Sequence, residues 1–391
     1  MSRARLDVAV AGGGVVGAAC ALALARAGLD VALAEPRPAP RWSAPRPDLR
    51  VYALAPDNAA LLERLDVWPQ VLAARAQPYR RMRVWDAAGG GELDFDAAAL
   101  ARAELGWIVE NDLLADRLWA ALAAAGVRLH SPARVEAMEQ DAAGVRLRLD
   151  DGTRLEARIA VAADGAGSAL RRLAGLEVDA HDYRQRGVVA YVETEHAHAD
   201  TAWQRFLPTG PLALLPFAGG RTSIVWTLPD ADAARVLALD DTAFATALTD
   251  ASAARLGRAV PVSARAAFPL RRQLVRRQVA GRLLLLGDAA HVVHPLAGQG
   301  VNLGLRDVAA LAAEVEAAAL RRADWAAPHR LARWARRRLS DNTVSAHAFE
   351  GIDRLFSNTD PLATLLRGPL LGLAGKLPPL QRALWRHAAG A

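Results

Sequence analysis

The chain has 391 residues, and its hydrophobic content of 52% is enough for a sizeable core divided between two or three domains. The formal net charge is +6, but Lys376 is the only lysine among 48 lysine and arginine residues, and no basic run is interleaved with aromatic residues, so we expect no nucleic-acid binding. The single cysteine, Cys20, excludes an internal disulfide and a cysteine-rich metal site, and we expect no metal.

The sequence also indicates where the protein resides. No apolar run approaches the roughly 18 residues that a membrane-spanning helix needs. The first predicted strand begins at Leu6, which leaves no room for a signal or transit peptide. We therefore expect a protein of the bacterial cytoplasm, in which Cys20 is a buried thiol of the first helix.

The first predicted elements have the order of a dinucleotide-binding unit. An apolar strand at residues 6–11 leads into a glycine-rich turn at 12–17, a helix at 15–27 and a second strand at 31–34 that ends in Glu35. This strand, turn, helix and strand followed by an acid is the context in which a G-x-G-x-x-G pattern binds a dinucleotide. The pattern alone does not separate FAD from NAD.

Three glycines of this turn and the acid after the second strand have predicted roles. Gly12 allows the tight turn, Gly14 lets the backbone approach a pyrophosphate, and Gly17 lets helix and strand pack closely. Val16 lies between the glycines, at the start of the helix. Glu35, close to 20 residues downstream, can accept hydrogen bonds from a ribose diol. All five are therefore candidate cofactor-binding residues.

Two later strands also end in glycine and an acid. The apolar run at residues 159–163 ends at Asp164 and Gly165, where a hairpin turn is the alternative interpretation. The apolar run at 283–286 ends at Gly287 and Asp288. A second glycine-rich turn then precedes a predicted helix at 303–319, and exposed amides at a helix N-terminus suit a negatively charged group. The candidate cofactor-binding residues of this turn are Pro295, Gly298, Gln299, Gly300 and Asn302.

The long string from Gly287 to Asp307 resembles the second FAD motif of the class A flavoprotein hydroxylases. With His294 and Pro295 ahead of Ala-Gly-Gln-Gly, it is similar to the ubiquinone-biosynthesis hydroxylases, which add oxygen to the ring of a polyprenylated phenol. The resemblance implies FAD, molecular oxygen, NAD(P)H as a transient reductant, and reaction through a flavin C4a-hydroperoxide. It also implies that Arg50 lies beside the flavin, for which an ordinary surface arginine is the alternative.

The same resemblance assigns parts of the flavin site. Asp164 and Gly165 would lie between the flavin and the approach path of the pyridine nucleotide, and Asp288 would bind the ribityl chain. The amides of residues 295–302 would stabilise negative charge on the pyrimidine side of the reduced flavin. His291 and His294 are candidate catalytic proton carriers, and a satisfied structural histidine is an equally good interpretation of each.

The implied fold is α/β, with a Rossmann-like FAD-binding domain interleaved with an antiparallel-sheet substrate domain, as in p-hydroxybenzoate hydroxylase, and a helical C-terminal region. The three glycine-acid sites must converge on one cofactor, so the chain must leave the nucleotide domain and return. The FAD-binding domain is expected at residues 1–72, 105–178 and 275–330, the substrate domain at 73–104 and 179–274, and the helical region at 331–391. Strands of the second sheet are expected near residues 80–85, 188–193, 205–215 and 222–228.

Some features depart from the resemblance or stay open. Many relatives have arginine after Glu-Asn where this chain has Asp112, which puts one flavin contact in doubt. The arginines at residues 336–338 are expected to form a solvated face. A flavin halogenase needs an active-site lysine, whereas Lys376 lies in the tail. The open alternatives are a flavin oxidase or reductase of another lipophilic or aromatic substrate, and a non-catalytic FAD-binding scaffold.

The implied partners follow from the substrate class. They are a polyprenylated phenol or quinone precursor, the inner face of the bacterial plasma membrane, and other ubiquinone-biosynthesis proteins; a homo-oligomer is left open. Residues 320–391 contain twelve Arg or Lys and five Asp or Glu, with leucines among them. This basic, leucine-rich region either docks peripherally on anionic lipid or packs on the FAD domain.

Overall fold

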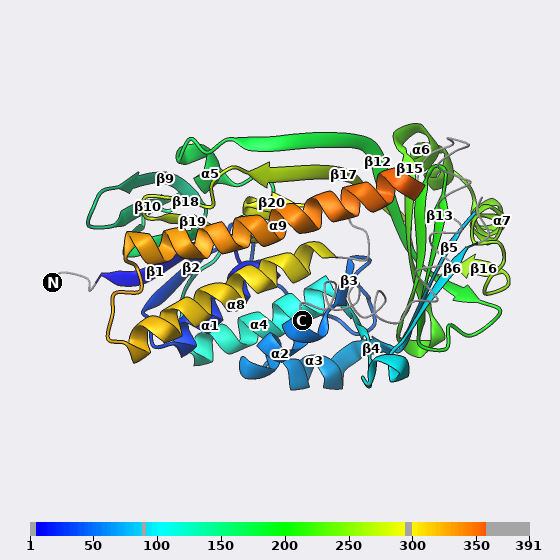
Figure 1. Ribbon diagram of the computed structural model, residues 1–391, viewed down its shortest axis with the longest axis horizontal. Helices are drawn as coiled ribbons and strands as arrows, with labels where there is room; N and C mark the ends of the chain where they lie inside the picture. The colour runs from blue at the N-terminus through cyan, green and yellow to red at the C-terminus, as the bar shows by residue number, and fades with distance from the viewer. Residues whose placement is uncertain (1–4, 88–90, 294–298, 357–391) are drawn as a thin grey trace.

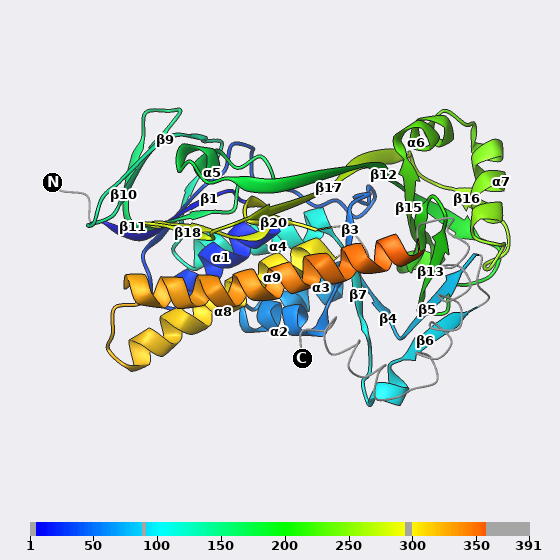
Figure 2. The same ribbon diagram turned by 45° about the horizontal axis from the view of Figure 1, so that its top comes forward.

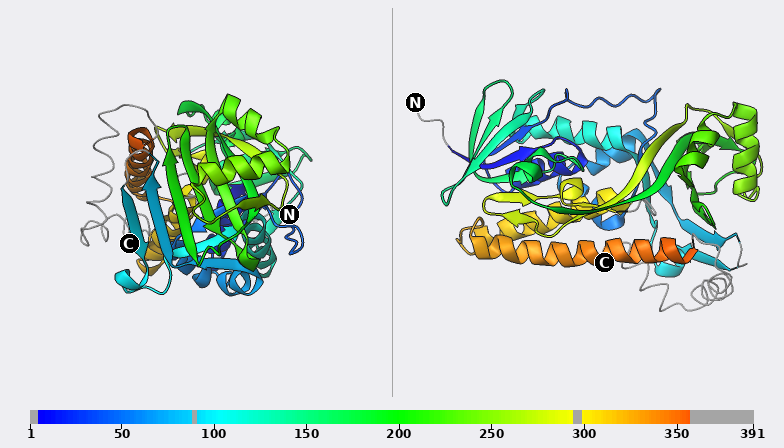
Figure 3. Two further views of the ribbon diagram at one scale, coloured as in Figure 1. Left: turned by 90° about the vertical axis from the view of Figure 1, so that its right-hand side faces the viewer. Right: turned by 90° about the horizontal axis from the view of Figure 1, so that it is seen from above.

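The computed structural model describes residues 5–87, 91–293 and 299–356. The molecule is elongated, with a helix-covered sheet at one end and a second sheet at the other (Figure 1). Two long strands, β12 (Val178–Thr194) and β17 (Ala266–Val275), run side by side between the two ends (Figures 1 and 3). The expected domain bounds stay a prediction.

The first sheet has the strand order β18-β19-β11-β1-β2-β8, and β10 and β9 extend from β11. Neighbours from β19 to β8 pair in parallel. Parallel strands buried on both faces are expected to be continuously apolar, as β2 and β19 are. The bounds are β1 Leu6–Ala11, β2 Val31–Ala34, β8 Arg128–His130, β9 Val135–Gln140, β10 Val145–Leu149, β11 Arg154–Ala162, β18 Val279–Ala280 and β19 Leu283–Leu285.

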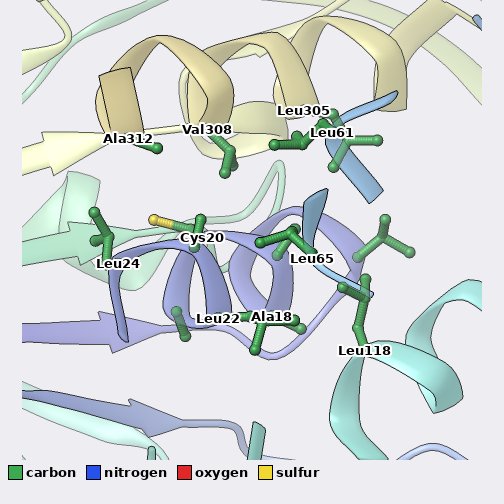
Figure 4. Close-up of a cluster of buried hydrophobic side chains, with 14 of the residues drawn as sticks. Ala18, Cys20, Leu22, Leu24, Leu61, Leu65, Leu118, Leu305, Val308 and Ala312 are labelled. Carbon is green, nitrogen blue, oxygen red and sulfur yellow. The ribbon is translucent and has the colours of Figure 1, made fainter. Parts of the chain in front are cut away.

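Helices cover the face of this sheet to which Val8 and Val10 point. They are α1 (Val15–Arg26), α4 (Asn111–Ala124) and α8 (Gln299–Leu320), and α9 (Pro328–Phe356) lies against α8 (Figures 1 and 2). Cys20 lies fully buried in α1 near Val308 of α8 (Figure 4), and burial raises the pKa of its thiol to about 12. The predicted buried thiol is confirmed.

The second sheet has the order β20-β17-β12-β15-β14-β13-β5-β6. It is antiparallel except that β13 and β5 pair in parallel. One predicted strand, at residues 205–215, is wrong, because a turn at Pro208 and Thr209 divides it into β13 and β14. The further bounds are β5 Arg81–Asp86, β6 Glu92–Asp96, β13 Thr201–Leu207, β14 Gly210–Pro216, β15 Thr222–Pro229, β16 Ala259–Pro261, which pairs with β12, and β20 His291–Val292.

Short elements surround these sheets. Helices α6 (Asp230–Leu237) and α7 (Asp241–Ala251) cover the outer face of the second sheet (Figure 2). A small sheet, β3-β7-β4, lies between the two ends of the molecule (Figure 1). The remaining bounds are β3 Val51–Leu54, β4 Ala76–Tyr79, β7 Gly106–Glu110, α2 Pro56–Arg64, α3 Trp68–Arg75 and α5 Ala169–Leu173, with 3-10 turns at Ala98–Leu100, Ala218–Gly220 and Gly287–Ala289.

The arginines at residues 336–338 do not all belong to a solvated face. Arg336 and Arg337 are exposed, but Arg338 is buried and its Nε lies 2.8 Å from Asp307 Oδ1. The sequence could not show this, because Asp307 lies on α8, 31 residues away.

Among the helices that the structure describes, none combines the length and the apolar character needed to cross a membrane. Residues 357–391 of the basic, leucine-rich region lie outside the described residues.

Candidate functional site

Two adjoining cavities lie between the sheets. The first, of about 370 Å³, is bounded by the glycine-rich turn after β1 and by the ends of β2 and β11. The second, of about 420 Å³, lies between β3, the start of α8 and the inner face of the second sheet. Four residues line both cavities, namely Arg50, Tyr52, Asp288 and Val301. A ligand extending from one cavity into the other would pass these residues.

The glycines of the first turn have the geometry that the sequence predicts. Gly12 has φ of +102°, and a Cβ there would lie 2.3 Å from the carbonyl oxygen of Ala163. A Cβ at Gly17 would lie 1.9 Å from the carbonyl oxygen of Gly12, so the helix starts against the turn. A Cβ at Gly14 would meet no atom within 4 Å, and this residue borders the first cavity. The backbone there is open to a ligand.

Glu35 lies at the end of β2, on the edge of the first cavity. Its Oε2 accepts a hydrogen bond from the Gly13 amide at 2.6 Å, and its Oε1 accepts one from Arg37 Nε at 3.0 Å. Trp119 on α4 fixes the other side of the turn, because its Nε1 donates to the Gly13 carbonyl oxygen at 2.6 Å. The Arg37 amide also donates to Glu35 Oε1, at 3.2 Å, so these contacts hold the turn in its shape and leave the second lone pair of Oε2 for a ligand.

Asp164, at the end of β11, lines the first cavity. Its Oδ2 accepts hydrogen bonds from the amides of Ala169, at 2.7 Å, and Leu170, at 3.3 Å. Its Oδ1 is buried and has no hydrogen-bond partner among the described residues. A buried acceptor without a donor is costly, so this oxygen suits a ligand hydroxyl. Gly165, with φ of +82°, borders the same cavity.

Asp288 lies on the turn after β19 and lines both cavities. Its carboxylate accepts no hydrogen bond from any residue that the structure describes. The preceding residue, Gly287, has φ of +56°, and its amide donates to Asp307 Oδ2 at 3.1 Å. A Cβ at Gly287 would lie 3.1 Å from Val16 Cγ1, so Val16 packs under the turn. The Asp288 carboxylate is thus held at the junction with its oxygens available.

Arg50 and Tyr52 line the junction together with Asp288. The Arg50 guanidinium carbon lies 5.4 Å from the centre of the Tyr52 ring, within the range of a cation–π contact. The Tyr52 hydroxyl donates to Asn111 Oδ1 at 2.9 Å. Burial raises the pKa of Tyr52 to about 12, so the hydroxyl remains neutral. The junction therefore carries one cation and one anion that are available to a ligand.

An acidic pair lies next to Asn111. The Asn111 Nδ2 donates to Asp112 Oδ1 at 2.9 Å and to Asp48 Oδ2 at 3.3 Å. Burial and the neighbouring Asp48 carboxylate raise the pKa of Asp112 above its usual range. The charged form of the Asp112 carboxyl group is therefore disfavoured.

The second cavity is mainly apolar. Its floor is the inner face of the second sheet, where Ala213 of β14 lies between Gln204 of β13 and Val225 of β15. Thr227 and Gly187 form the next row. The opposite wall contains β3 and the start of α8. Among the described residues lining this cavity, the titratable side chains are Arg50, Tyr52, Arg271 and Asp288.

His291 does not line either cavity within the described residues. It is buried, and its Nε2 lies 2.6 Å from Asp307 Oδ2. Its Nδ1 is buried without a hydrogen-bond partner among the described residues. This geometry favours the structural alternative over the catalytic role that the sequence suggested. His294 lies outside the described residues, so its role stays a prediction.

The second glycine-rich turn is described in part. Gly300 borders the second cavity, and Gln299 begins α8. The Asn302 side chain is satisfied by protein, because Oδ1 accepts from the Ala55 amide at 2.9 Å and Nδ2 donates to the Ala53 carbonyl at 2.8 Å. That side chain joins α8 to the end of β3, and the predicted role of its amide stays a prediction. Pro295 and Gly298 lie outside the described residues.

A model of the FAD binding domain family matches residues 5–342. The 3-demethoxyubiquinol 3-hydroxylase of Escherichia coli is 36% identical over 392 residues, which cover 100% of both chains. The chain belongs to the FAD-binding family of flavoprotein hydroxylases. The ubiquinone hydroxylase UbiL of Rhodospirillum rubrum is 38% identical and covers 98% of this chain and 89% of its own. The predicted family, FAD cofactor and monooxygenase class are confirmed.

Solved structures agree on the fold. The p-nitrophenol 4-monooxygenase PnpA from Pseudomonas putida superposes with a TM-score of 0.77 at 21% identity, over 97% of this chain and 96% of that chain. PqsL from Pseudomonas aeruginosa has a TM-score of 0.77 at 22% identity, over 93% of this chain and 100% of that chain. The predicted hydroxylase-like α/β fold is confirmed.

The sequence analysis missed several residues of the second cavity, including Tyr52, Gln204, Thr227 and Phe268. A signal for Gln204 was present in the alternation of its strand. Ala202, Gln204 and Phe206 are buried, whereas Trp203 and Arg205 between them are less so. Alternation with period two places Gln204 on a buried face, where a polar residue stands out. The sequence did not show which cavity that face would border.

Proposed function

We propose that this protein is a FAD-dependent monooxygenase that hydroxylates the aromatic ring of a polyprenylated phenol in ubiquinone biosynthesis. The observation that carries the proposal is the junction at Asp288, where an apolar cavity of about 420 Å³ opens onto the nucleotide cavity. A ring held in the second cavity would lie beside a flavin that crosses the junction. The relatives named as ubiquinone-biosynthesis hydroxylases support the substrate class.

The residues of the two cavities fit FAD. The turn at Gly12 and Gly14 would hold the pyrophosphate, Glu35 the ribose, and the orphaned Oδ1 of Asp164 a ligand hydroxyl. Asp288 would bind the ribityl chain, with Arg50 facing the flavin. Bound FAD, once reduced by NAD(P)H, supplies the activation of molecular oxygen. The contribution of the protein is to hold FAD and the ring at the junction and to exclude water.

The apolar lining of the second cavity carries out this exclusion. Val189, Val225 and Leu215 from the sheet face Val293 and Val301 from the other wall. Such a wall binds an uncharged ring and the first units of an isoprenoid tail by burying apolar surface. Among the described lining residues no histidine is present to carry a proton.

We propose that the enzyme reaches its substrate peripherally, from the cytoplasmic face of the membrane. Phe268 lines the second cavity and is 47% exposed, so the cavity has an apolar rim. The basic, leucine-rich region adds charge suited to anionic lipid. Liposome flotation tests this: binding should need anionic lipid and weaken with salt. Equal flotation on neutral liposomes would contradict it. Contacts with other ubiquinone-biosynthesis proteins, and a homo-oligomer, stay predictions.

The place of this reaction in quinone biosynthesis can be tested in cells. Deletion of the gene should cause one prenylated phenol to accumulate, and mass spectrometry should show that it lacks a single ring hydroxyl relative to the next intermediate. Complementation with the wild-type gene should remove the intermediate, whereas the Asp288→Ala variant should restore less quinone. Unchanged quinone intermediates after deletion would contradict the proposed function.

A further inference from the structure

The amide of Gln204 is a polar group without a partner in the wall of the second cavity. Gln204 is 7% exposed and borders that cavity. In the part of the chain that the structure describes, its side chain makes no hydrogen bond. The amide is open to the cavity, where a ligand or water can satisfy it, since a polar group that leaves water without a hydrogen bond costs free energy.

The surroundings of Gln204 are apolar. Across the sheet its neighbours on the cavity face are Ala213 of β14 and Val225 of β15. On the next strand the neighbour of Val225 is Val189. These side chains are small, so they leave space above the sheet and offer no hydrogen bond. Gln204 therefore supplies a directional hydrogen-bonding group on a part of the wall that otherwise makes only apolar contacts.

Other polar groups of this cavity lie elsewhere. Asp288, Arg50 and Tyr52 belong to the junction with the nucleotide cavity. Arg271 borders the cavity from β17 and pairs with Asp182, with 3.6 Å between Nε and Oδ2. Thr227 borders the same cavity from β15 and lies two residues after Val225, which pairs with Ala213. Gln204 is on β13, at the far side of β14 from Thr227. A ring between the junction and the sheet would present one end to FAD and the other to Gln204.

We infer that Gln204 is a specificity-determining residue that recognises a hydroxyl group on the substrate ring. This inference rests on the proposed function. The amide oxygen accepts a hydrogen bond from the ring hydroxyl, and the amide N–H group can donate to a neighbouring ring oxygen. Because the amide is neutral, it holds the hydroxyl without taking its proton. The contact selects rings that carry a hydroxyl and fixes which ring carbon faces the flavin.

The test compares two probes on the FAD-loaded protein. One is a phenol with a geranyl tail at the neighbouring ring position, and the other is geranylbenzene, which lacks the hydroxyl. Dissociation constants are measured from the absorbance change of the bound oxidised flavin. The variant is Gln204→Met, which keeps the length of the side chain and removes the amide, and Gln204→Leu is a second apolar variant.

The matched control is Gln185→Met. Gln185 lies on β12 of the same sheet, its Nε2 donates to the Thr209 carbonyl at 3.3 Å, and it borders neither cavity within the described residues. We expect Gln204→Met to weaken binding of the geranylphenol about five- to tenfold, as for loss of one neutral hydrogen bond. Binding of geranylbenzene should change less than about twofold, and the control should bind both probes as the wild type does.

Equal weakening of both probes by the Gln204 variants would overturn the inference, and so would unchanged binding of the phenol. Selective loss of phenol binding supports it, whether or not the bound phenol is oxygenated. A wild-type protein that binds the phenol and never inserts oxygen would contradict the proposed function and leave the Gln204 contact standing. The two failures are therefore distinguishable.

Discussion

His291 and Asp307 form a buried pair, with the imidazole Nε2 2.6 Å from the carboxylate Oδ2. The same carboxylate accepts from the Gly287 amide at 3.1 Å and from Arg338 Nε at 2.8 Å. Asp307 therefore ties α9 to the turn that carries Asp288. The pair explains why a histidine beside the flavin motif need not be a proton carrier: its ring is used to hold the turn.

We predict that Asp307→Asn destabilises the protein strongly. The substitution removes the buried carboxylate partner of Arg338 and leaves only the exposed Asp341 paired with its guanidinium, and breaking a buried ion pair costs at most about 3–5 kcal/mol. Denaturant unfolding of the FAD-loaded protein measures the loss. The control is Asp66→Asn, which breaks the exposed pair with Arg26 and should cost less than about 1 kcal/mol. Equally small losses of unfolding free energy in both variants would show that the contacts of Asp307 contribute little to the stability of the fold.

The same pair predicts a pH dependence. Burial alone would raise the pKa of Asp307, but attraction to His291 and Arg338 outweighs it and holds the pKa below its ordinary value. A carboxyl with a lowered folded-state pKa stabilises the fold above its unfolded pKa of about 3.9 and loses that effect as the pH falls further. The stability difference between wild type and Asp307→Asn should therefore shrink below about pH 4. A difference that grows there would contradict the assignment.

Asp288→Ala should weaken FAD binding. The carboxylate stands at the junction of the two cavities, and loss of a charge-assisted hydrogen bond costs about 1.5–3 kcal/mol, or roughly a 10- to 100-fold rise in Kd. Flavin fluorescence during titration of the apoprotein measures this. Asp232→Ala on α6, which borders neither cavity within the described residues, should retain wild-type affinity. Full affinity in Asp288→Ala would remove this residue from the FAD site.

Asp112→Asn should stabilise the protein at neutral pH, by less than about 1 kcal/mol at this partly exposed site. The pKa of Asp112 is raised by burial and by Asp48, so the folded state favours the protonated form and the ionised form destabilises it. The gain should disappear as the pH falls below the unfolded pKa of about 3.9. Thermal unfolding at pH 7 and pH 4 compares the two proteins.

Asp151→Asn provides a control of opposite sign. Backbone hydrogen bonds, first that from the Thr153 amide, lower the pKa of Asp151, so its ionised form stabilises the fold. This variant should melt below the wild type at pH 7. Loss of stability in both variants would show that Asp112 makes a favourable charged contact.

Phe268→Ala should discriminate between substrates by tail length. Phe268 lies at the exposed rim of the second cavity, so a long isoprenoid tail leaving the cavity would pack on its ring. We expect KM to rise at least about fivefold for a long-tailed phenol and to stay unchanged for a one-unit tail, since burying an aromatic side chain contributes about 1.5–3 kcal/mol. Val262→Ala, an exposed apolar residue away from this cavity, is the control. Equal effects on both tails would exclude a tail path over Phe268.

The nucleotide half of the site could be predicted from the sequence because its signals are local. The strand Leu6–Ala11 has the predicted bounds, Gly12 follows it directly, and Gly17 lies in the first turn of α1. The second cavity could not be predicted in the same way. Gln204, Val225 and Val189 come together only through strand pairing over long separations, and the turn at Pro208 was not recognised.

The role of His291 was ambiguous for the same reason. Its partner Asp307 lies 16 residues away on a helix, and the third member, Arg338, comes from α9. Nothing in the local sequence distinguishes an imidazole that faces a ligand from one that pairs with a buried carboxylate. The three-dimensional contacts make that distinction.

We propose that this protein inserts one atom of molecular oxygen into the ring of a prenylated phenol. The most direct measurement is turnover of a short-tailed prenylated phenol by the FAD-loaded enzyme and NAD(P)H under ¹⁸O₂, with the product analysed by mass spectrometry. We expect one labelled ring hydroxyl per turnover, and no label when only the water carries ¹⁸O. A ring hydroxyl whose oxygen comes from water, or oxidation without oxygen insertion, would contradict it.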